Sequence, residues 1–380
     1  MPTLKHRDIL LYSDTARSAD ALYFGRVDVP DAFVALSAGG KKIAIVSALE
    51  FGRVKKASDF DLVLPLEGFV EKARRAWPGK KAGAARVIVL AAKELKVRLL
   101  TVPEDFPAGL YKELSDLGLK VSIADGLLFP EREIKTPAEA LALKEGNRCS
   151  AAGIAAAERV LRESKIKGRR LFYRGSVLTS ERLKVAIETA CIEQGAVSSN
   201  TIVAGGDQGC DPHNRGSGPI YANEMVIVDV FPRVSATGFH GDMTRTFLRG
   251  RASDAQKRIW AAVREAQLAA LSTIRAGVPG NEVHRRVSET LVSHGFETRH
   301  TASGSVGFFH GTGHGLGLEV HEPPRMNAHS EAPLKKGAVV TVEPGLYYPG
   351  VGACRIEDVV QVTSAKPRML SSYPYHWELK

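Results

Sequence analysis

Short apolar runs alternate with helical patterns over the first third of the chain. Residues 32–37 and 41–47 are apolar and β-like, and the Ala38-Gly39-Gly40 segment between them is typical of a hairpin turn. Further elements are expected as strands at 62–66, 97–102 and 120–123, a helix at 107–117, and an ambiguous apolar segment long enough for a helix at 83–95. Strands that alternate with helices predict an α/β domain.

The pattern changes near residue 130, where we place the boundary between two domains, residues 1–130 and 131–380. The junction is charged, contains two prolines and opens a long helix. Thr136 is a suitable N-cap, Pro137 fits the first turn, and Glu139 completes a capping box. Further helices are expected at 180–193, 253–274 and about 281–294, and strands at 202–204, 225–231, 240–248, 338–343 and 355–362.

The composition is that of an ordinary globular protein, with 44% apolar and 25% charged residues among 380. No apolar run approaches the ~18 residues that a membrane helix needs, and the N-terminus has no long apolar stretch of the kind found in signal peptides. The four cysteines form no CxxC pair, which favours reduced thiols. We therefore expect a cytoplasmic protein without a membrane partner.

The net charge of +10 raises the alternative of a nucleic-acid-binding protein. Lys and Arg exceed Asp and Glu by four within residues 1–136 and by six within residues 137–380, so the excess is spread along the chain. No run of five like charges occurs. A solvated basic surface is the favoured interpretation, and no nucleic-acid partner is expected.

Two aspartates stand in or beside apolar β-type runs. Asp229 lies within Met225-Val-Ile-Val-Asp-Val-Phe, and Asp242 follows thirteen residues later. A buried carboxylate is costly unless it is paired or bound to a metal. If the turn-rich segment between them joins antiparallel strands, the two side chains share one face. An aspartate near a turn is more often a cap or a local hydrogen-bond acceptor, and for this pair alone that alternative is the stronger one.

Three histidines fall within twelve residues, at His310, His314 and His321, interleaved with four glycines at alternate positions from 311 to 317. Glycines at this density allow unusual backbone geometry and close approach of a ligand or another strand. A single histidine of this kind is usually a hydrogen-bonded core residue. The grouping favours a functional site.

Two glutamates lie in further β-type runs. Glu343 belongs to Val-Thr-Val-Glu-Pro-Gly, and Glu357 follows Arg355 in Cys-Arg-Ile-Glu-Asp-Val-Val. The segment between them is turn-rich, so their strands are expected to pair. Structural salt bridges are the alternative interpretation, with Arg355 as the obvious partner.

Taken together, four carboxylates and one imidazole suggest a metal centre. The carboxylates carry a combined charge of −4 and would repel one another strongly in a low dielectric, whereas two divalent cations would neutralise them. Oxygen-rich ligation with one histidine suits Mn²⁺, Co²⁺, Fe²⁺ or Zn²⁺. Two such ions ~3.5–4 Å apart can bridge a water, lower its pKa and polarise a carbonyl, which is hydrolytic chemistry.

These segments, in this order, resemble the metallopeptidase family that includes methionine aminopeptidase, aminopeptidase P and prolidase. The resemblance covers roughly residues 132–365 and is most specific in Gly-His314-Gly-Leu-Gly-Leu-Glu-Val-His321-Glu, Val-Glu343-Pro-Gly and Arg355-Ile-Glu-Asp. It implies an α+β pita-bread C-terminal catalytic domain. The first ~130 residues suit the smaller α/β domain of the creatinase and prolidase type.

The resemblance implies a ligand set for two divalent metal ions. Asp229 matches the terminal ligand of one metal, Asp242 and Glu357 match the bridging carboxylates, and His314 and Glu343 match the ligands of the other metal. The family's usual spacing between the two aspartates is 11 residues, whereas here it is 13. Two extra residues in a hairpin loop leave both aspartates on the same face, so we interpret the difference as a loop variant.

Catalytic and substrate-binding roles follow from the same resemblance. His213 matches the histidine that contacts substrate or leaving group, His321 the one that stabilises the oxyanion, and Glu343 the proton relay. Three further residues are expected to bind substrate. His310 matches a pocket histidine, and Arg325 matches a residue near the free carboxylate of a dipeptide. Arg355 is expected to fix the neighbouring Glu357.

The function implied is hydrolysis of Xaa-Pro bonds by a metal-bridging hydroxide that attacks the scissile carbonyl, with a small peptide carrying proline at its second position as substrate. A dipeptidase (prolidase) is favoured by Arg325, although an exposed loop arginine is an equal alternative. Aminopeptidase P, another small-amide hydrolase, and a non-enzymatic binding protein on the same fold stay open. Relatives are often dimers, so a homodimer is expected.

Overall fold

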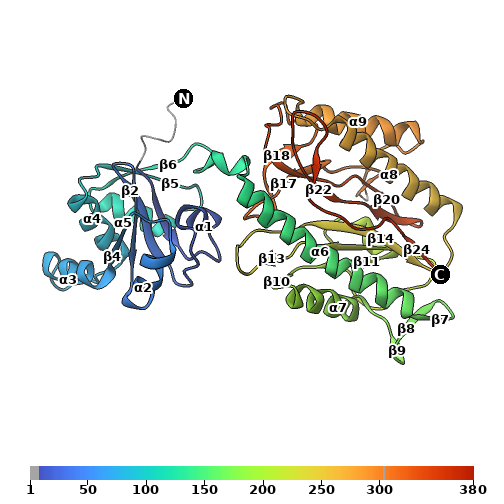
Figure 1. The fold of residues 1–380 in the computed structure, drawn as a ribbon, viewed down its shortest axis with the longest axis horizontal. Helices are drawn as coiled ribbons and strands as arrows, with labels where there is room; N and C mark the ends of the chain where they lie inside the picture. Colours follow the sequence, from blue (N-terminus) through green and yellow to red (C-terminus); the bar gives the residue numbers. More distant parts are fainter. Residues whose placement is uncertain (1–7, 303) are drawn as a thin grey trace. The chain divides into compact units, whose positions relative to one another are not determined.

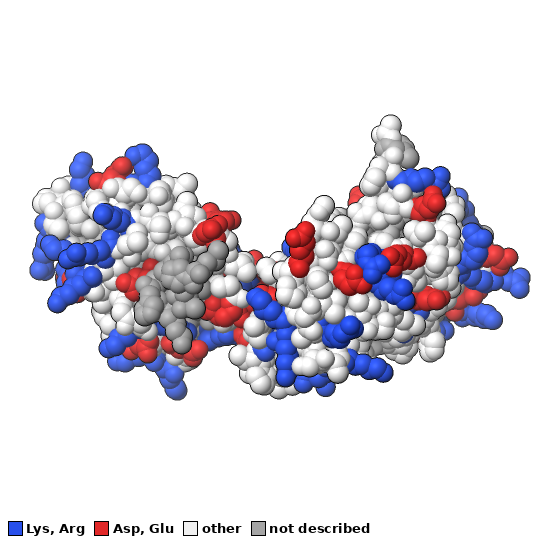
Figure 2. Space-filling model, turned by 90° about the horizontal axis from the view of Figure 1, so that it is seen from above, with Lys and Arg blue, Asp and Glu red and all other residues white. Residues whose placement is uncertain are grey.

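The computed structural model describes residues 8–302 and 304–380 and divides the chain into two compact units, Met1–Pro130 and Glu131–Lys380 (Figure 1). Each unit has its own hydrophobic clusters. Lys and Arg side chains are interspersed with Asp and Glu over the face seen in Figure 2.

The first unit is an α/β domain. Its strands are β1 (Leu10–Ser13), β2 (Phe33–Ala38), β3 (Lys41–Val46), β4 (Leu62–Pro65), β5 (Leu99–Val102) and β6 (Lys120–Ile123), and its helices are α1 (Ala19–Gly25), α2 (Ala48–Ala57), α3 (Leu66–Ala76), α4 (Ala84–Glu94) and α5 (Ala108–Asp116). The predicted hairpin joins β2 and β3, with Gly39 and Gly40 at positive φ in its turn. β3 pairs with β4 and β5 pairs with β6 in parallel. The ambiguous segment is the helix α4, whose apolar face is buried.

The second unit consists of two halves, each with a sheet covered by two helices (Figure 1). In the first half, α6 (Pro137–Glu163) and α7 (Ser180–Glu193) pack on a sheet of order β11-β12-β14-β24. Its strands are β11 (Ile202–Gly205), β12 (Met225–Val230), β14 (Met243–Arg249) and β24 (Glu378–Leu379), with short pieces at β7 (Lys165–Lys167), β8 (Arg170–Tyr173), β9 (Ser176–Val177), β10 (Ala196–Val197) and β13 (Arg233–Val234). The predicted capping box of Thr136 and Glu139 opens α6, which confirms that prediction.

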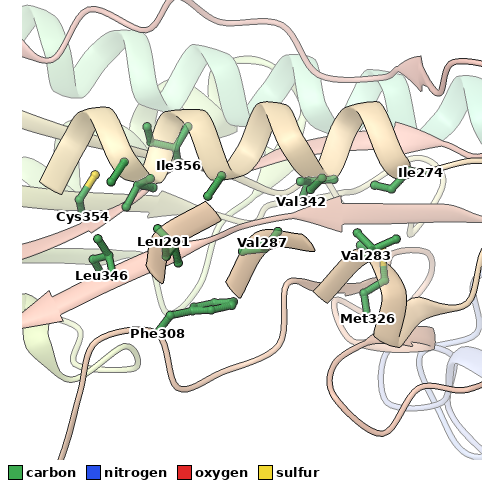
Figure 3. Close-up of a cluster of buried hydrophobic side chains, with 14 of the residues drawn as sticks. Ile274, Val283, Val287, Leu291, Phe308, Met326, Val342, Leu346, Cys354 and Ile356 are labelled. Carbon is green, nitrogen blue, oxygen red and sulfur yellow. The ribbon is translucent and has the colours of Figure 1, made fainter. Parts of the chain in front are cut away.

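In the second half, α8 (Asp254–Thr273) and α9 (Gly280–Ser293) cover a sheet of order β18-β17-β19-β22-β23. Its strands are β17 (Gly313–Gly315), β18 (Glu322–Met326), β19 (Val339–Val342), β22 (Asp358–Gln361) and β23 (Arg368–Met369), with hairpins β15 (Arg299–Thr301)–β16 (Gly304–Val306) and β20 (Gly345–Tyr348)–β21 (Gly352–Arg355). Figure 3 shows the core of this half, where side chains of α9 and α8 meet those of β19, β20 and β21.

Two predicted strands differ in extent from the observed ones. The strand expected at 240–248 begins only at Met243, since residues before it belong to a loop tied to β13 by the Arg233–His240 bridge. The strand expected at 355–362 is divided into β21 and β22, because the Ile356 amide bonds the Pro344 carbonyl and the Glu357 amide bonds the Thr244 carbonyl. At this point the chain leaves the hairpin β20–β21 and joins the sheet of β19 and β22.

Candidate active site

The first half brings the two aspartates together as expected. β12 and β14 are antiparallel neighbours with Asp229 opposite Thr244, and Asp242 lies two residues before Thr244. Residues two apart on a strand point to the same face, so both carboxylates face the same side. This register confirms the prediction of antiparallel strands on either side of the longer loop.

Helix α6 fixes the backbone around Asp242. The Asp242 amide donates to the Asn147 side chain at 3.3 Å. The helix approaches closely at Gly146, because a Cβ on Gly241 would lie 2.0 Å from the Gly146 carbonyl oxygen. Glycine at both positions is therefore what allows α6 to lie directly behind the aspartate.

The second half supplies the remaining groups. β19 and β22 are antiparallel with Val342 opposite Asp358, which places Glu343 just after one strand and Glu357 just before the other. The predicted pairing is thus confirmed, although the segment between them forms the hairpin β20–β21 rather than a simple turn. His314 lies in β17, which pairs with β19.

All ten site residues predicted from the sequence line one cavity of about 700 Å³ in the second unit. The charged and imidazole groups come from strands of both halves and from the loops beside them, and the rest of the lining is largely apolar. The predicted residues are His213, Asp229, Asp242, His310, His314, His321, Arg325, Glu343, Arg355 and Glu357. Apolar neighbours include Ile202, Pro212, Phe231, Phe309 and Val320.

The donor set fits a metal cation. Ligand atoms of Asp242, His314 and Glu357 all lie within 4.8 Å of one another, and all three residues are buried. Glu343 adds a carboxylate oxygen 3.2 Å from the His314 Nε2. The His314 Nδ1 faces the Gly315 carbonyl at 3.2 Å, so Nε2, which faces the carboxylates, is the nitrogen available as a ligand. Among the described residues, buried Asp229 Oδ1 has no hydrogen-bond partner, as expected of an atom arranged for an ion.

Burial of several carboxylates close together raises the pKa values of three of them. Desolvation, followed by repulsion from neighbouring carboxylates, holds the pKa of Asp242 and of Glu357 well above their ordinary values. Desolvation also raises the pKa of Asp229, against the opposing effect of Arg355. Without a cation, protonation of Asp242 and Glu357 relieves their mutual repulsion.

Glu343 and His314 behave as an ion pair within this cluster. Desolvation opposes charge on both groups, but the hydrogen bond between them and their mutual attraction outweigh it. The pKa of Glu343 falls to about 2, and the pKa of His314 is raised. Glu343 is therefore the carboxylate of the set that stays ionised most readily.

Arg355 supports a different carboxylate from the one expected. Its guanidinium donates to Asp229 Oδ2 at 2.8 Å, whereas Glu357 accepts a hydrogen bond from the Thr244 hydroxyl at 2.8 Å. Arg355 reaches Glu357 only indirectly, through its 3.4 Å contact with Thr244. The prediction that Arg355 fixes Glu357 was therefore wrong, because Arg355 ends β21 and points across to β12.

Sequence reasoning missed two buried residues, Tyr347 and Thr244, that hydrogen-bond residues lining the cavity. The buried Tyr347 hydroxyl lies between His310 Nε2 at 2.8 Å and the Arg355 guanidinium at 3.1 Å. It falls in a segment interpreted as a turn, where only the alternation of β20 could have indicated an inward side chain. Thr244 had no sequence signal beyond its place in an apolar run, since its role depends on the register with Asp229.

His310 and His321 are held in their uncharged form. Desolvation, joined by the positive charges of His314 and Arg325, lowers the pKa of His321 to about 4. Desolvation also lowers the pKa of buried His310 to about 4. His321 stacks edge-on against His314, with ring centroids 4.3 Å apart. Neutral imidazoles at these positions can donate or accept one hydrogen bond each.

Comparison with curated proteins finds similarity to peptidases. The chain is 33% identical over 173 residues to the Xaa-Pro dipeptidase of Pyrococcus furiosus, a match that covers 45% of this chain and 47% of the relative. It is 36% identical over 184 residues to an uncharacterized peptidase of Bacillus subtilis, covering 48% of this chain and 49% of the relative. The chain thus spans about half the length of the curated relatives it matches.

Solved structures resemble both units. A Xaa-Pro dipeptidase from Bacillus anthracis superposes with a TM-score of 0.80 at 26% identity, over 98% of this chain and 95% of that one. An X-Pro aminopeptidase from Thermotoga maritima gives 0.80 at 22% identity over 98% and 97%, a likeness of fold. The N-terminal α/β domain and the pita-bread C-terminal domain expected from the sequence are thereby confirmed. Residues 142–364 match the model of metallopeptidase family M24, more than half of the chain, and this protein belongs to that family.

Proposed function

We propose that this protein is a dinuclear-metal hydrolase that cleaves Xaa-Pro bonds, acting chiefly as a dipeptidase. The observation that carries the proposal is the pairing of a buried carboxylate and imidazole cluster with an unpaired guanidinium in one cavity. His314 lies opposite Arg325 in the β17–β18 register, so their side chains emerge on the same face. Among the described residues, Arg325 has no ion-pair partner, although it lines the cavity.

The residues that would hold two divalent ions are the five that converge from both sheets: Asp229, Asp242, His314, Glu343 and Glu357. When bound, such ions polarise a carbonyl and make water a better nucleophile near neutral pH. Mn²⁺, Co²⁺, Zn²⁺ and Fe²⁺ all suit oxygen-rich ligation with one imidazole, so the donor set leaves their choice open.

The protein's own groups would move and balance the protons of the reaction. Glu343, with its pKa of about 2, is ionised at neutral pH and can accept a proton from the attacking water and pass it to the leaving proline nitrogen. His321, neutral at that pH, can donate a hydrogen bond to the oxygen that becomes negative as the carbonyl is attacked. His213 and His310 also line the cavity, where they can contact the peptide.

Arg325 would select dipeptides by their free carboxylate. A guanidinium binds a carboxylate through two parallel hydrogen bonds, and this one is not engaged by an acidic side chain of the described residues. The similar solved structures include both a Xaa-Pro dipeptidase and an X-Pro aminopeptidase, so release of the N-terminal residue from longer peptides is the second candidate. A binding protein without activity is the third.

The test compares Ala-Pro, its amide Ala-Pro-NH₂ and Ala-Pro-Ala, digested side by side with Mn²⁺, Co²⁺ or Zn²⁺ and with a chelator control, and followed by mass spectrometry. A dipeptidase cuts Ala-Pro fastest, and Arg325→Met raises its KM for Ala-Pro while leaving that for the amide nearly unchanged. Preferential cleavage of Ala-Pro-Ala supports the aminopeptidase instead. No cleavage with any metal contradicts the enzymatic proposal.

The homodimer and the cytoplasmic location stay predictions. Light scattering coupled to size exclusion decides the first. For the second, the structure contributes one fact: within residues 8–302 and 304–380, no helix has both the length and the apolar character needed to cross a membrane.

A further inference from the structure

His321 is exposed at the cavity edge, and its ring lacks local support. No side chain of the described residues hydrogen-bonds this ring, which stacks edge-on against His314. A group that must donate to a developing negative charge gains little unless it is held in place beforehand. The backbone that carries His321 must therefore be positioned by its neighbours.

The next residue, Glu322, is the first residue of β18 and is held by two buried cations. It is only 4% exposed, and its carboxylate accepts from Arg132 at 2.8 Å and from Lys135. Arg132 and Lys135 are themselves 9% and 6% exposed. Buried charges are retained at a cost in desolvation, and losing one partner is strongly destabilising. Three buried charges next to His321 are costly for stability, which suggests that they have a functional role.

Further contacts shape the same loop. Glu319, at its exposed rim, also accepts from Arg132, at 2.7 Å. The Gly317 carbonyl accepts from the His240 amide at 2.9 Å. A Cβ on Gly317 would lie 2.2 Å from a Glu322 carboxylate oxygen, so the loop folds directly onto that carboxylate. The turn from residue 317 to residue 322 is consequently closed around Glu322.

The cationic side of this arrangement comes from a segment remote in sequence. Arg132 and Lys135 lie just before α6, about 190 residues from Glu322 along the chain. The Lys135 amide bonds the Gly337 carbonyl at 3.0 Å, and Glu133 pairs with Lys335 at 2.6 Å. These contacts hold the segment to the rest of the second unit independently of Glu322, so it can act as a fixed support.

We propose that Glu322, clamped by Arg132 and Lys135, is the positioning residue for His321. The inference rests on the proposed function, because it takes His321 to be the hydrogen-bond donor to the oxyanion. Glu322 does not line the cavity and acts only through the backbone that it shares with His321. The clamp fixes where β18 begins, and with it the point from which the His321 ring extends.

The test is a double-mutant cycle on the metal-loaded protein with Ala-Pro as substrate. Glu322→Gln keeps the side-chain shape and removes the charge. We expect it to lower kcat ~10-fold, as a small misplacement of a catalytic group does. We expect His321→Ala to lower kcat ~100-fold. The double variant should be no slower than His321→Ala, with KM within about twofold of wild type.

Matched variants separate positioning from general stability. Lys335→Met removes an exposed ion pair of the same segment that contributes only ~0–1 kcal/mol, while the bond from the Lys135 amide to the Gly337 carbonyl still holds the segment, so this variant should keep wild-type kcat. Arg132→Lys should retain more kcat than Arg132→Met, since it keeps the charge. Metal content and thermal midpoint of Glu322→Gln are measured alongside, and its crystal structure should show the His321 ring displaced.

Additive losses in the cycle, an undisplaced ring, or an equal loss in Lys335→Met would overturn the inference. So would a Glu322→Gln protein whose lower rate is fully accounted for by lost metal. If His321→Ala keeps wild-type turnover, the proposed role of His321 fails and the positioning inference falls with it. If His321→Ala loses turnover while Glu322→Gln keeps it, the proposed function stands and the positioning inference alone is wrong.

Discussion

Removal of the metal ions should make the thermal stability of this protein depend on pH in a way that reveals the ligand cluster. Asp229, Asp242 and Glu357 have raised pKa values in the folded protein without metal, and so does His314. Each binds protons more strongly when folded than when unfolded, so its contribution to stability is present at low pH and is lost as pH rises towards its folded pKa. Metal binding displaces these protons, and the stabilisation that it adds must therefore grow with pH.

The size of the effect follows from linkage. One displaced proton changes the metal-induced stabilisation by ~1.4 kcal/mol per pH unit. For a domain of ~150–250 residues, 1 kcal/mol corresponds to a shift of ~2–4 °C in Tm. Each ion at a hundredfold excess over its Kd adds a further ~2.7 kcal/mol. The difference in Tm between loaded and metal-free protein should thus widen by several degrees per pH unit.

The assay is calorimetry of metal-free and Mn²⁺-loaded protein at pH values from 5 to 8. The pKa values of His310 and His321 are lowered to about 4 in the folded protein, so both add stability as pH rises from there towards the ordinary histidine pKa of the unfolded chain. This contribution is the same in both samples and cancels in the difference. Glu343, whose pKa is about 2, stays ionised across the whole range. A metal-induced shift that is constant or shrinks with pH would refute the assignment of the crowded carboxylates as ligands.

Three further outcomes can be checked by routine measurements. His314→Ala and Glu357→Ala should each abolish turnover and lower bound metal, as read by elemental analysis, and full activity with full metal content in either variant rules out the ligand set. Gly241→Ala forces a Cβ to within 2.0 Å of the Gly146 carbonyl and should lower the free energy of unfolding by ~2–4 kcal/mol in a denaturant titration, whereas a neutral effect contradicts the close helix approach. Thr244→Val removes the hydroxyl that donates to Glu357 and should weaken metal affinity ~10-fold in isothermal titration, with an unchanged affinity as the contrary result.

The sequence predicted the site better than it predicted the scaffold. Acidic residues within apolar β runs are costly enough to be visible in a single chain, and the four singled out from the sequence, Asp229, Asp242, Glu343 and Glu357, line the cavity. Helix α2 escaped notice because Val54 is its one buried residue, which leaves almost no apolar period to read. The partner of Arg355 could not be predicted either. Arg355 ends the hairpin β20–β21, and its bond to Asp229 depends on how that hairpin packs against β12, which the sequence does not show.

The distribution of the ligand groups over two halves has a consequence for how the protein folds. Asp229 and Asp242 belong to one core and Glu343 and Glu357 to the other, and the hydrogen bonds that join the halves at the site link residues more than a hundred positions apart. The ions therefore find a complete ligand set only after the two halves have packed against each other. Metal should therefore slow unfolding far more than it speeds folding, because the ligand cluster is among the last parts of the native structure to form.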